Sequence, residues 1–405
     1  MKITKIKLAR TDGERLKARV SITFNNCLTI NDCYVIIDEE KEQKFVAFPF
    51  TKDKETGEMI ELAFPRRADA AVPIKEQVLE LYYSGEDEYV YEAPVELCKV
   101  TDCKAKKIEQ GLFEVKVILD DEFVINKLVC KVQNNSLSFR HPFSKVVDEV
   151  RTFVVNFENQ ILIQDITMWL AKSCMPHDSV QEIKPKTPAE RREFSNKRIK
   201  SMGIACHENL PMIESSKDVK LKSLDEICKR AIAALISTQI ACDINNDNYE
   251  ESLKFFSNKL EQFEGVKECL NEKEKRLFDG TYSRQDAIDV DWEYETYWAL
   301  VWALGLIDDD ISNASNICDC TRAITLVSKT RNLEEFKRKC SLRNIEEILD
   351  MLDLYYRYHW ATTEKRINAD TPIGNLNPSV VVERRRGLEW LISNEEDWYD
   401  ISLDT

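Results

Sequence analysis

The chain has 405 residues, of which 43% are hydrophobic and 32% are charged, and it carries a net charge of −15. This length exceeds the usual size of one hydrophobic core, so two or three domains are expected. No apolar run is long enough to span a bilayer, and the first residues lack the apolar core of a signal peptide. These features predict a cytoplasmic protein without membrane contact.

The thirteen cysteines are scattered along both halves of the chain and are odd in number. This pattern favours reduced thiols over a disulfide framework. The sequence also lacks the paired Cys-x-x-Cys motifs that would predict a zinc site. The charge is also uneven, because residues 1–90 hold 14 Lys/Arg against 17 Asp/Glu and residues 201–405 hold 25 against 39. A strongly acidic C-terminal half repels polyanions, so any nucleic-acid surface should lie in the N-terminal half.

Residues 2–50 read as a meander of half-buried strands. Apolar and polar side chains alternate from Arg19 to Phe24, and Asp12-Gly13 marks the turn between the first two strands. A polar loop at 51–57 and one more strand follow. We then expect a short helix that begins at Pro73.

The same pattern returns about a hundred residues later. Four matches carry this repeat. They are Ile3-Thr-Lys-Ile6 with Val100-Thr-Asp-Cys103 at an offset of 97, Val20-Ser-Ile-Thr-Phe24 with Val115-Lys-Val-Ile-Leu119 and Leu28-Thr-Ile-Asn31 with Phe123-Val-Ile-Asn126 at 95, and Phe48-Pro-Phe50 with His141-Pro-Phe143 at 93. Each change of offset is two residues, which preserves the inward and outward faces of every strand. The sequence therefore predicts a first module over 1–90 and a diverged second module over about 95–172.

The first module resembles the SpoVG family of bacterial septation regulators. The resemblance covers about residues 1–85 and rests on the turn at 12–18, on Phe45-Val-Ala-Phe-Pro49, on the Lys-rich loop ending at Glu58 and on the closing helix. It implies a small module that pairs into dimers, binds DNA and RNA and influences septation and sporulation. Two tandem copies would then form a pseudo-dimer within one chain.

Phosphate binding needs several cations on one exposed surface, and the first module offers such a group. Its members are Lys52, Lys54, Arg66, Arg67 and Lys75. The competing interpretation is ordinary surface charge, since Asp53, Glu55, Glu58 and Glu76 are interleaved with them. The second module keeps the strands but lacks counterparts of these cations, so we expect binding through the first module alone.

Residues 173–188 contain three prolines and form the best linker candidate, and the periodicity after them is helical almost throughout. Residues 189–405 therefore predict an all-α domain. This part resembles a bacterial helical domain of unknown function, number 4272. The matches include Glu208-Asn-Leu-Pro211, the Trp298–Gly305 stretch, Leu354–Trp360 and Asn377–Arg384. The resemblance implies a fold but no activity.

One candidate pocket lies in the helical domain, where a histidine near carboxylates and arginines could bind an anion or transfer protons. Its members are His359, Trp360, Arg366, Glu383 and Arg384. The competing interpretation is a core histidine, because His359 falls on the apolar face of its helix. The acidic run at 308–310 reads as a solvated loop, and no catalytic motif is present.

Together these features predict an α+β protein, with two tandem SpoVG-like β-meander-plus-helix modules followed by an all-α domain. The leading hypothesis is a non-enzymatic nucleic-acid-binding regulator that needs no cofactor and no metal. The alternative hypothesis is a protein-interaction or immunity-type module. In that case the acidic helical domain binds a protein partner and the β modules are scaffold.

Overall fold

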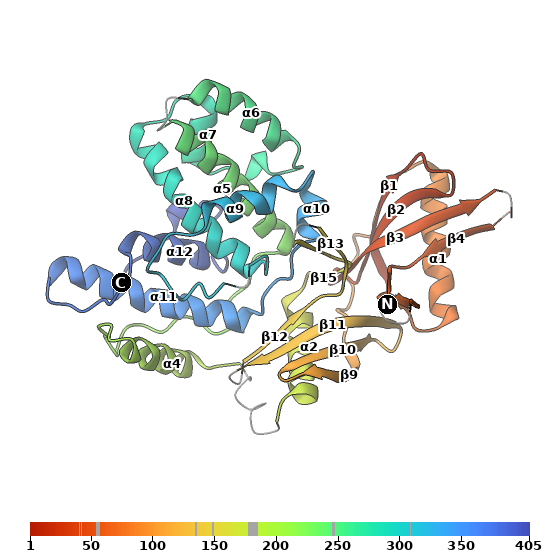
Figure 1. Cartoon of the computed structure of the whole chain (residues 1–405), viewed down its shortest axis with the longest axis horizontal. Coiled ribbons are helices and arrows are strands. Elements are labelled where there is room, and N and C mark those ends of the chain that lie inside the picture. Colours follow the sequence, from red (N-terminus) through yellow and green to blue (C-terminus); the bar gives the residue numbers. More distant parts are fainter. Residues whose placement is uncertain are drawn as a thin grey trace. The chain divides into compact units, whose positions relative to one another are not determined.

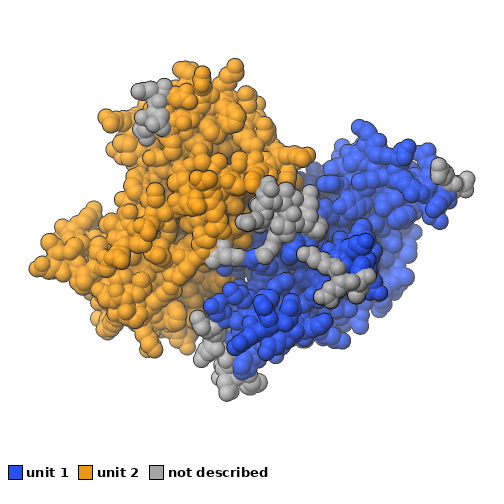
Figure 2. All heavy atoms as spheres, in the orientation of Figure 1, with its two compact units in different colours: residues 1–184, 338–344 blue, residues 185–337, 345–405 orange. Residues whose placement is uncertain are grey.

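The computed structural model describes residues 1–405 except 40, 42, 54–56, 134–135, 148–149, 177–184, 245–247 and 308. The chain divides into two compact units (Figure 2). Unit 1 comprises residues 1–184 together with 338–344, and unit 2 comprises residues 185–337 and 345–405. Among the described residues, unit 1 holds the strands and two helices, while the regular structure of unit 2 is helical (Figure 1). Much of the predicted linker at 173–188 lies outside the described residues.

The first sheet of unit 1 is built on a four-stranded meander. Its strands are β1 (Ile3–Arg10), β2 (Leu16–Phe24), β3 (Leu28–Asp38) and β4 (Gln43–Ala47). Val20, Ile22 and Phe24 are all buried on one face of β2, as their alternation predicts. The short strand β8 (Glu88–Val90) pairs with β1 at one edge of this sheet.

The second sheet follows the same order along the chain. Its strands are β9 (Val100–Glu109), β10 (Leu112–Leu119), β11 (Phe123–Gln133) and β12 (Ser136–Arg140), each paired with the next. After each meander comes a two-stranded hairpin: β5 (Phe50–Lys52) with β6 (Met59–Glu61), and β13 (Phe143–Val147) with β14 (Val150–Phe153). Each hairpin leads through a short strand to a helix, α1 (Ala68–Ser84) or α2 (Gln160–Cys174).

The two short strands before the helices cross between the sheets. The strand β7 (Ala63–Pro65) pairs with β11, where Ala63 faces Ile125, and β15 (Val155–Phe157) pairs with β3, where Val155 faces Ile30. Phe24 and Phe123 also meet with ring centroids 5.2 Å apart. The two meanders therefore share backbone pairing and a core, and each supplies a strand to the other.

A short segment from far along the chain completes unit 1. Residues 338–344 lie against it, and the backbone N–H of Phe153 donates to the carbonyl of Arg338 at 2.6 Å. The guanidinium of Arg338 forms an ion pair with Asp32 of β3. Asn344 donates to the hydroxyl of Thr167 in α2 at 3.1 Å. Because this segment interrupts the helical part of the chain, sequence periodicity did not predict its place.

Unit 2 is a helical assembly around two central helices, α5 and α8. Its α-helices are α4 (Pro188–Ser201), α5 (Leu224–Ile244), α6 (Tyr249–Glu261), α7 (Glu272–Asp279), α8 (Arg284–Ala303), α9 (Cys320–Ser328), α10 (Leu333–Lys337), α11 (Ile345–Ile367) and α12 (Pro378–Trp390). Two short 3₁₀ turns lie at Lys267–Cys269 and Trp398–Asp400. The helix α8 packs against α5 on one side and α12 on another (Figure 1).

Local sequence signals explain most helix starts in unit 2. Ser223 and Glu226 form a reciprocal cap of α5, with Ser223 N–H donating to Glu226 at 2.8 Å and Glu226 N–H donating to the Ser223 hydroxyl at 3.2 Å. Ser283 and Asp286 make the same arrangement at α8. The prediction for α1 was wrong, because α1 begins at Ala68 and contains Pro73 in its interior.

Candidate nucleic-acid interface and helical pocket

Two of the predicted cations, Arg66 and Arg67, lie where β7 ends and α1 begins. The backbone N–H of Arg66 donates to the carbonyl of Glu122 at 2.6 Å, which extends the pairing of β7 with β11. Arg67 is the N-cap residue of α1, and no side-chain cap is seen there within the described residues. The first N–H groups of a helix favour anions, so both guanidiniums lie near a favourable environment for a phosphate.

Each of these arginines already has a carboxylate beside it. Arg66 Nη1 is 3.2 Å from Asp121, and Arg67 Nε is 3.1 Å from Asp69. The two guanidinium side chains are 48% and 61% exposed. Ion pairs this exposed contribute little to stability, so a phosphate could displace the carboxylates at small cost.

The other three predicted cations are spread over different elements. Lys52 is exposed at the end of β5, and Lys75 is partly buried in α1. Lys54 lies outside the described residues. The structure therefore brings Arg66 and Arg67 together by chain adjacency, while Lys52 and Lys75 lie on separate elements of the first module.

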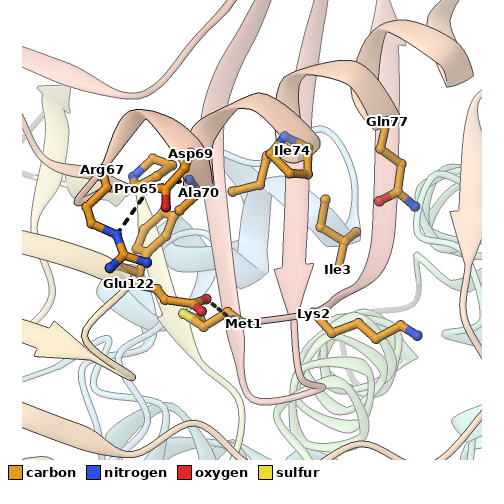
Figure 3. A pocket seen from close by; sticks show the side chains of 12 residues that line it. Met1, Lys2, Ile3, Pro65, Arg67, Asp69, Ala70, Ile74, Gln77 and Glu122 are labelled. Atoms are coloured by element: carbon orange, nitrogen blue, oxygen red, sulfur yellow. Dashed lines mark hydrogen bonds and ion pairs between the residues drawn. The ribbon is translucent and has the colours of Figure 1, made fainter.

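A pocket of about 530 Å³ opens beside Arg67, between α1, the start of β1 and the start of β11. Figure 3 shows Arg67 and Glu122 at one end of it and Lys2 and Gln77 at the other. The amino group of Met1 forms an ion pair with Glu122. Apolar side chains line the pocket between these ends, and cations and carboxylates occur together there. The pocket is therefore not strongly basic, and Arg67 contributes to it as part of a mixed lining.

In unit 2, three of the five predicted pocket residues share a hollow of about 470 Å³. His359 of α11, Arg366 of α11 and Glu383 of α12 line it. Glu383 also forms an ion pair with Arg386, at 3.0 Å. Lys273 and Tyr399 are also among the polar residues of the lining. Arg366 is exposed and adds a cation to a lining whose other charges include the Glu383–Arg386 and Lys273–Asp289 pairs.

The electrostatics of this hollow favour a neutral imidazole. Burial, together with the charges of Arg385, Arg366 and Arg386, lowers the pKa of His359 to about 4. Arg385 Nη1 lies 2.7 Å from His359 Nδ1. A guanidinium can only donate, so Nδ1 accepts and the proton of the neutral ring is on Nε2. The hollow can thus present a neutral imidazole and an exposed arginine to a small anionic group.

The remaining two predicted residues lie elsewhere. The ring of Trp360 packs 5.4 Å from that of His207. Arg384 is buried, and its Nε donates to Glu295 at 2.8 Å while its Nη1 donates to the carbonyl of Asn313 at 2.9 Å. Arg384 is therefore engaged in the interior of unit 2 and does not line the hollow.

Sequence reasoning missed a buried charged cluster next to this hollow. Arg230 of α5 forms an ion pair with Glu274 at 2.7 Å, and its guanidinium carbon lies 3.7 Å from the ring centre of Trp398. Glu293 of α8 is fully buried and lies 3.6 Å from Arg230. Burial and the neighbouring Glu274 raise the pKa of Glu293 well above its ordinary value. The cluster joins three helices, which no local pattern in the sequence indicates.

Membrane spans and metal clusters are both missing from the part of the chain that the structure describes. No helix there is both long and apolar enough to cross a membrane. Within the same residues, no group of three or more His, Cys, Asp or Glu side chains is arranged to hold a metal ion. The cysteines in this part of the chain are all free thiols.

The architecture defines a class of protein in which a β-rich unit built on meander sheets is fused to an all-helical unit. Residues 1–84 match the SpoVG family, and residues 191–401, more than half of the chain, match the family described as "Domain of unknown function (DUF4272)". The chain belongs to the SpoVG family through its N-terminal part and to the DUF4272 family through its helical part.

Several relatives are similar to the N-terminal part of the chain. The chain is 35% identical over 82 residues to a protein of Bdellovibrio bacteriovorus, 34% over 88 residues to one of Caldanaerobacter subterraneus, and 38% over 84 residues to one of Staphylococcus aureus. These matches cover 20%, 22% and 20% of this chain, and 73%, 93% and 80% of the relatives. Each relative is named "Putative septation protein SpoVG". No solved structure matches the chain.

Proposed function

We propose that this chain is a cytoplasmic, non-enzymatic regulator that binds DNA or RNA through its first module and acts in septation or sporulation. The observation that carries the proposal is the exposed pair Arg66 and Arg67 at the start of α1. Phosphate groups bind where guanidiniums and free helix N–H groups meet. The names of the SpoVG relatives support the link to septation.

We further propose that residues 95–172 are a second SpoVG-like module and that the two modules form a pseudo-dimer within one chain. The reciprocal pairing of β7 with β11 and of β15 with β3 supports this interpretation. Because β7 and β15 belong to the same chain as the sheets with which they pair, a second chain is not needed to supply these strands. We therefore expect the full chain to have the mass of a monomer by light scattering, and a stable homodimer held through unit 1 would contradict the pseudo-dimer.

The test of nucleic-acid binding uses the full chain and a salt titration. A fluorescently labelled oligonucleotide of about 20 nucleotides should bind at low salt, and the affinity should fall steeply as salt rises. Replacing Arg66 and Arg67 with alanine should weaken binding and lower the slope of log affinity against log salt by roughly 0.7–0.9 for each lost phosphate contact. The matched control replaces Lys254 and Lys267, two exposed lysines of unit 2, with alanine. Absence of binding at low salt would refute the proposal.

A second candidate function is protein binding by unit 2. A hollow of about 610 Å³ between α5, α6 and α9 is lined mainly by apolar side chains, and Phe255 at its rim is 64% exposed. Because residues 201–405 are strongly acidic, the partner that fits is a protein with an apolar anchor on a basic segment. A pull-down with the full chain and with Phe255→Ser tests this, and capture that is unchanged by the substitution would contradict it.

A further inference from the structure

The second sheet of unit 1 has a lysine-rich outer face. The helix α2 covers the opposite face, where Cys130 and Cys174 share a hydrogen bond and Val115 and Val117 are buried. The outer positions of β9, β10 and β11 carry five lysines and three carboxylates. They are Lys104, Lys106, Lys116, Lys127 and Lys131, with Asp102, Glu109 and Glu114. In a chain with a net charge of −15, this face is a local concentration of positive charge.

Two of these lysines are directly opposite each other on adjacent strands. Lys104 of β9 is paired in register with Lys116 of β10, and both are exposed. Opposed side chains on neighbouring strands are about 5 Å apart at Cβ, and like charges there are destabilising. Lys104 has one carboxylate near it, Asp102 at 3.8 Å. An anion between the two ammonium groups would remove the repulsion.

Lysines can protect the edge of a sheet from pairing with another chain, but this role explains only part of the lysine pattern. Among the described residues β9 pairs with β10 alone, and lysines on an edge strand discourage pairing with another chain. That argument accounts for Lys104 and Lys106. It does not account for Lys116 and Lys131, which lie on β10 and β11 in the interior of the sheet.

The first sheet has a different outer face. There Lys5 is paired with Glu88 at 3.0 Å, and Glu88 belongs to the additional edge strand β8. Lys17 lies 3.9 Å from Glu39. In the second sheet, Glu114 lies 2.8 Å from Lys127, and the exposed Lys104, Lys106, Lys116 and Lys131 outnumber the two remaining carboxylates, Asp102 and Glu109.

We propose that the outer face of β9, β10 and β11 binds the sugar-phosphate backbone of a nucleic acid. The proposal rests on the nucleic-acid-binding function proposed above and places a contact surface in the second module. The sequence predicts contacts through the first module alone, and this proposal adds a surface in the second module. The outer positions of β10 and β11 include Leu112 and Val129 and no aromatic ring among the described residues, so the contacts go to phosphates with weak sequence preference.

The experiment compares four forms of the full chain in the oligonucleotide titration: wild type, Lys104→Ala with Lys116→Ala, Lys104→Arg with Lys116→Arg, and the Lys254→Ala with Lys267→Ala control. We expect the Lys104/Lys116 alanine variant to bind on the order of tenfold more weakly at low salt and to have a lower salt slope. The arginine variant should bind like wild type, because it keeps both charges. Thermal unfolding of the alanine variant should be unchanged or shifted upward, which separates lost contacts from lost folding.

The outcomes distinguish this proposal from the one it rests on. If replacing Arg66 and Arg67 weakens binding while the Lys104/Lys116 alanine variant binds like wild type, the lysine face is not a contact surface and the first module alone binds. If only the lysine variant weakens binding, the lysine face is a contact surface and the arginine pair is not. If wild type binds no oligonucleotide, or binds anionic phospholipid vesicles instead, both proposals are wrong. Self-association of the alanine variant with unchanged affinity would assign the lysines to edge protection and overturn the proposal.

Discussion

Lys104 of β9 and Lys116 of β10 are opposed in register on the exposed face of the second sheet, where like charges repel. A surface selected for stability alone would place opposite charges at such a pair. At this pair, the charges that would stabilise the sheet therefore differ from the charges that would bind a phosphate. The effects of a charge change on stability and on oligonucleotide binding can each be measured.

Replacing Lys116 with glutamate should stabilise the second sheet and weaken oligonucleotide binding in the same molecule. An opposite-charge pair contributes about 0.2–1 kcal/mol, and salt screens it. Hydrogen exchange of the β9 and β10 amides at low salt should slow accordingly, with a smaller effect at high salt. Lys217→Glu, at an exposed position of unit 2, is the control and should leave these amides unchanged. Faster exchange in the Lys116 variant would show that Lys116 makes a stabilising contact.

Gly387 of α12 is required by the close approach of α12 to α8. A Cβ atom at this position would lie 2.7 Å from the carbonyl oxygen of Thr296 and 3.1 Å from Cβ of Ala299. Gly387→Ala should therefore lower the free energy of unfolding by about 1–3 kcal/mol, although alanine is the better helix former. Urea unfolding followed by far-UV circular dichroism measures this change. Ser379→Ala, at an exposed position of the same helix, should change the free energy by less than about 0.5 kcal/mol.

The strands of the first module could be predicted because their signal is local. Burial alternates along β2 as polarity does in the sequence, so Val20, Ile22 and Phe24 identify the core face from the amino-acid pattern alone. The start of α1 was misplaced because proline is common in the first turn of helices. The alanines at 70 and 71 extend the helix towards Arg67 instead, and Pro73 gives up one backbone hydrogen bond in the interior.

The candidate sites were harder to predict because their contacts join distant parts of the chain. Arg66 could be predicted as an exposed cation, but its partner Asp121 is 55 residues away and is brought near by the pairing of β7 with β11. Asp32 and Arg338 are separated by 306 residues. The lysine face has a local signal, the alternation of Lys104 and Lys106 around Ala105. Its significance depends on Lys116, and only the strand register reveals that pairing.

His141 should make unit 1 sensitive to acid. Its ring is fully buried among aromatic side chains, 4.7 Å from Phe157 and 5.7 Å from Phe153. Burial lowers the pKa of His141 from its ordinary value of 6.5 to about 3, against a smaller opposing effect of the Val155 backbone. Between these two values the unfolded chain binds a proton that the folded chain does not. The free energy of unfolding should therefore fall as the pH is lowered from about 6.5 towards 3.

His141→Phe removes this proton linkage while keeping an aromatic ring in the cluster. We expect the variant to unfold like wild type near neutral pH and to lose less stability on acidification, with a difference of a few kcal/mol at the acid end. Thermal unfolding of both forms between about pH 4 and 7 measures the difference. His359 titrates in the same direction, so a His359→Gln variant of unit 2 is the matched comparison. Parallel pH profiles for wild type and His141→Phe would contradict the assigned linkage.

In the buried cluster of Arg230, Glu274 and Glu293, replacing different members should lower the free energy of unfolding by different amounts. Arg230→Met leaves the buried carboxylate of Glu274 without its cation, and breaking a buried ion pair in this way costs about 3–5 kcal/mol. Glu293→Gln should cost far less. An amide oxygen can still accept the bonds that Glu293 now receives from Asn271 at 2.9 Å and from the Trp398 indole at 3.3 Å.

The pH dependence of the stability of the Glu293→Gln variant shows whether Glu293 is protonated in the folded chain. Because burial raises the pKa of Glu293 above its ordinary value of 4.5, the folded chain holds a proton that the unfolded chain releases. The contribution of this group to stability is therefore present below about pH 4.5 and is lost as the pH rises towards the folded pKa. Relative to wild type, Glu293→Gln should become progressively more stable as the pH is raised from about 5 to 8, as measured by urea unfolding and by hydrogen exchange of α8. A constant difference across that range would mean that Glu293 stays ionised beside Arg230, and the cluster would then be a fully charged ion-pair network.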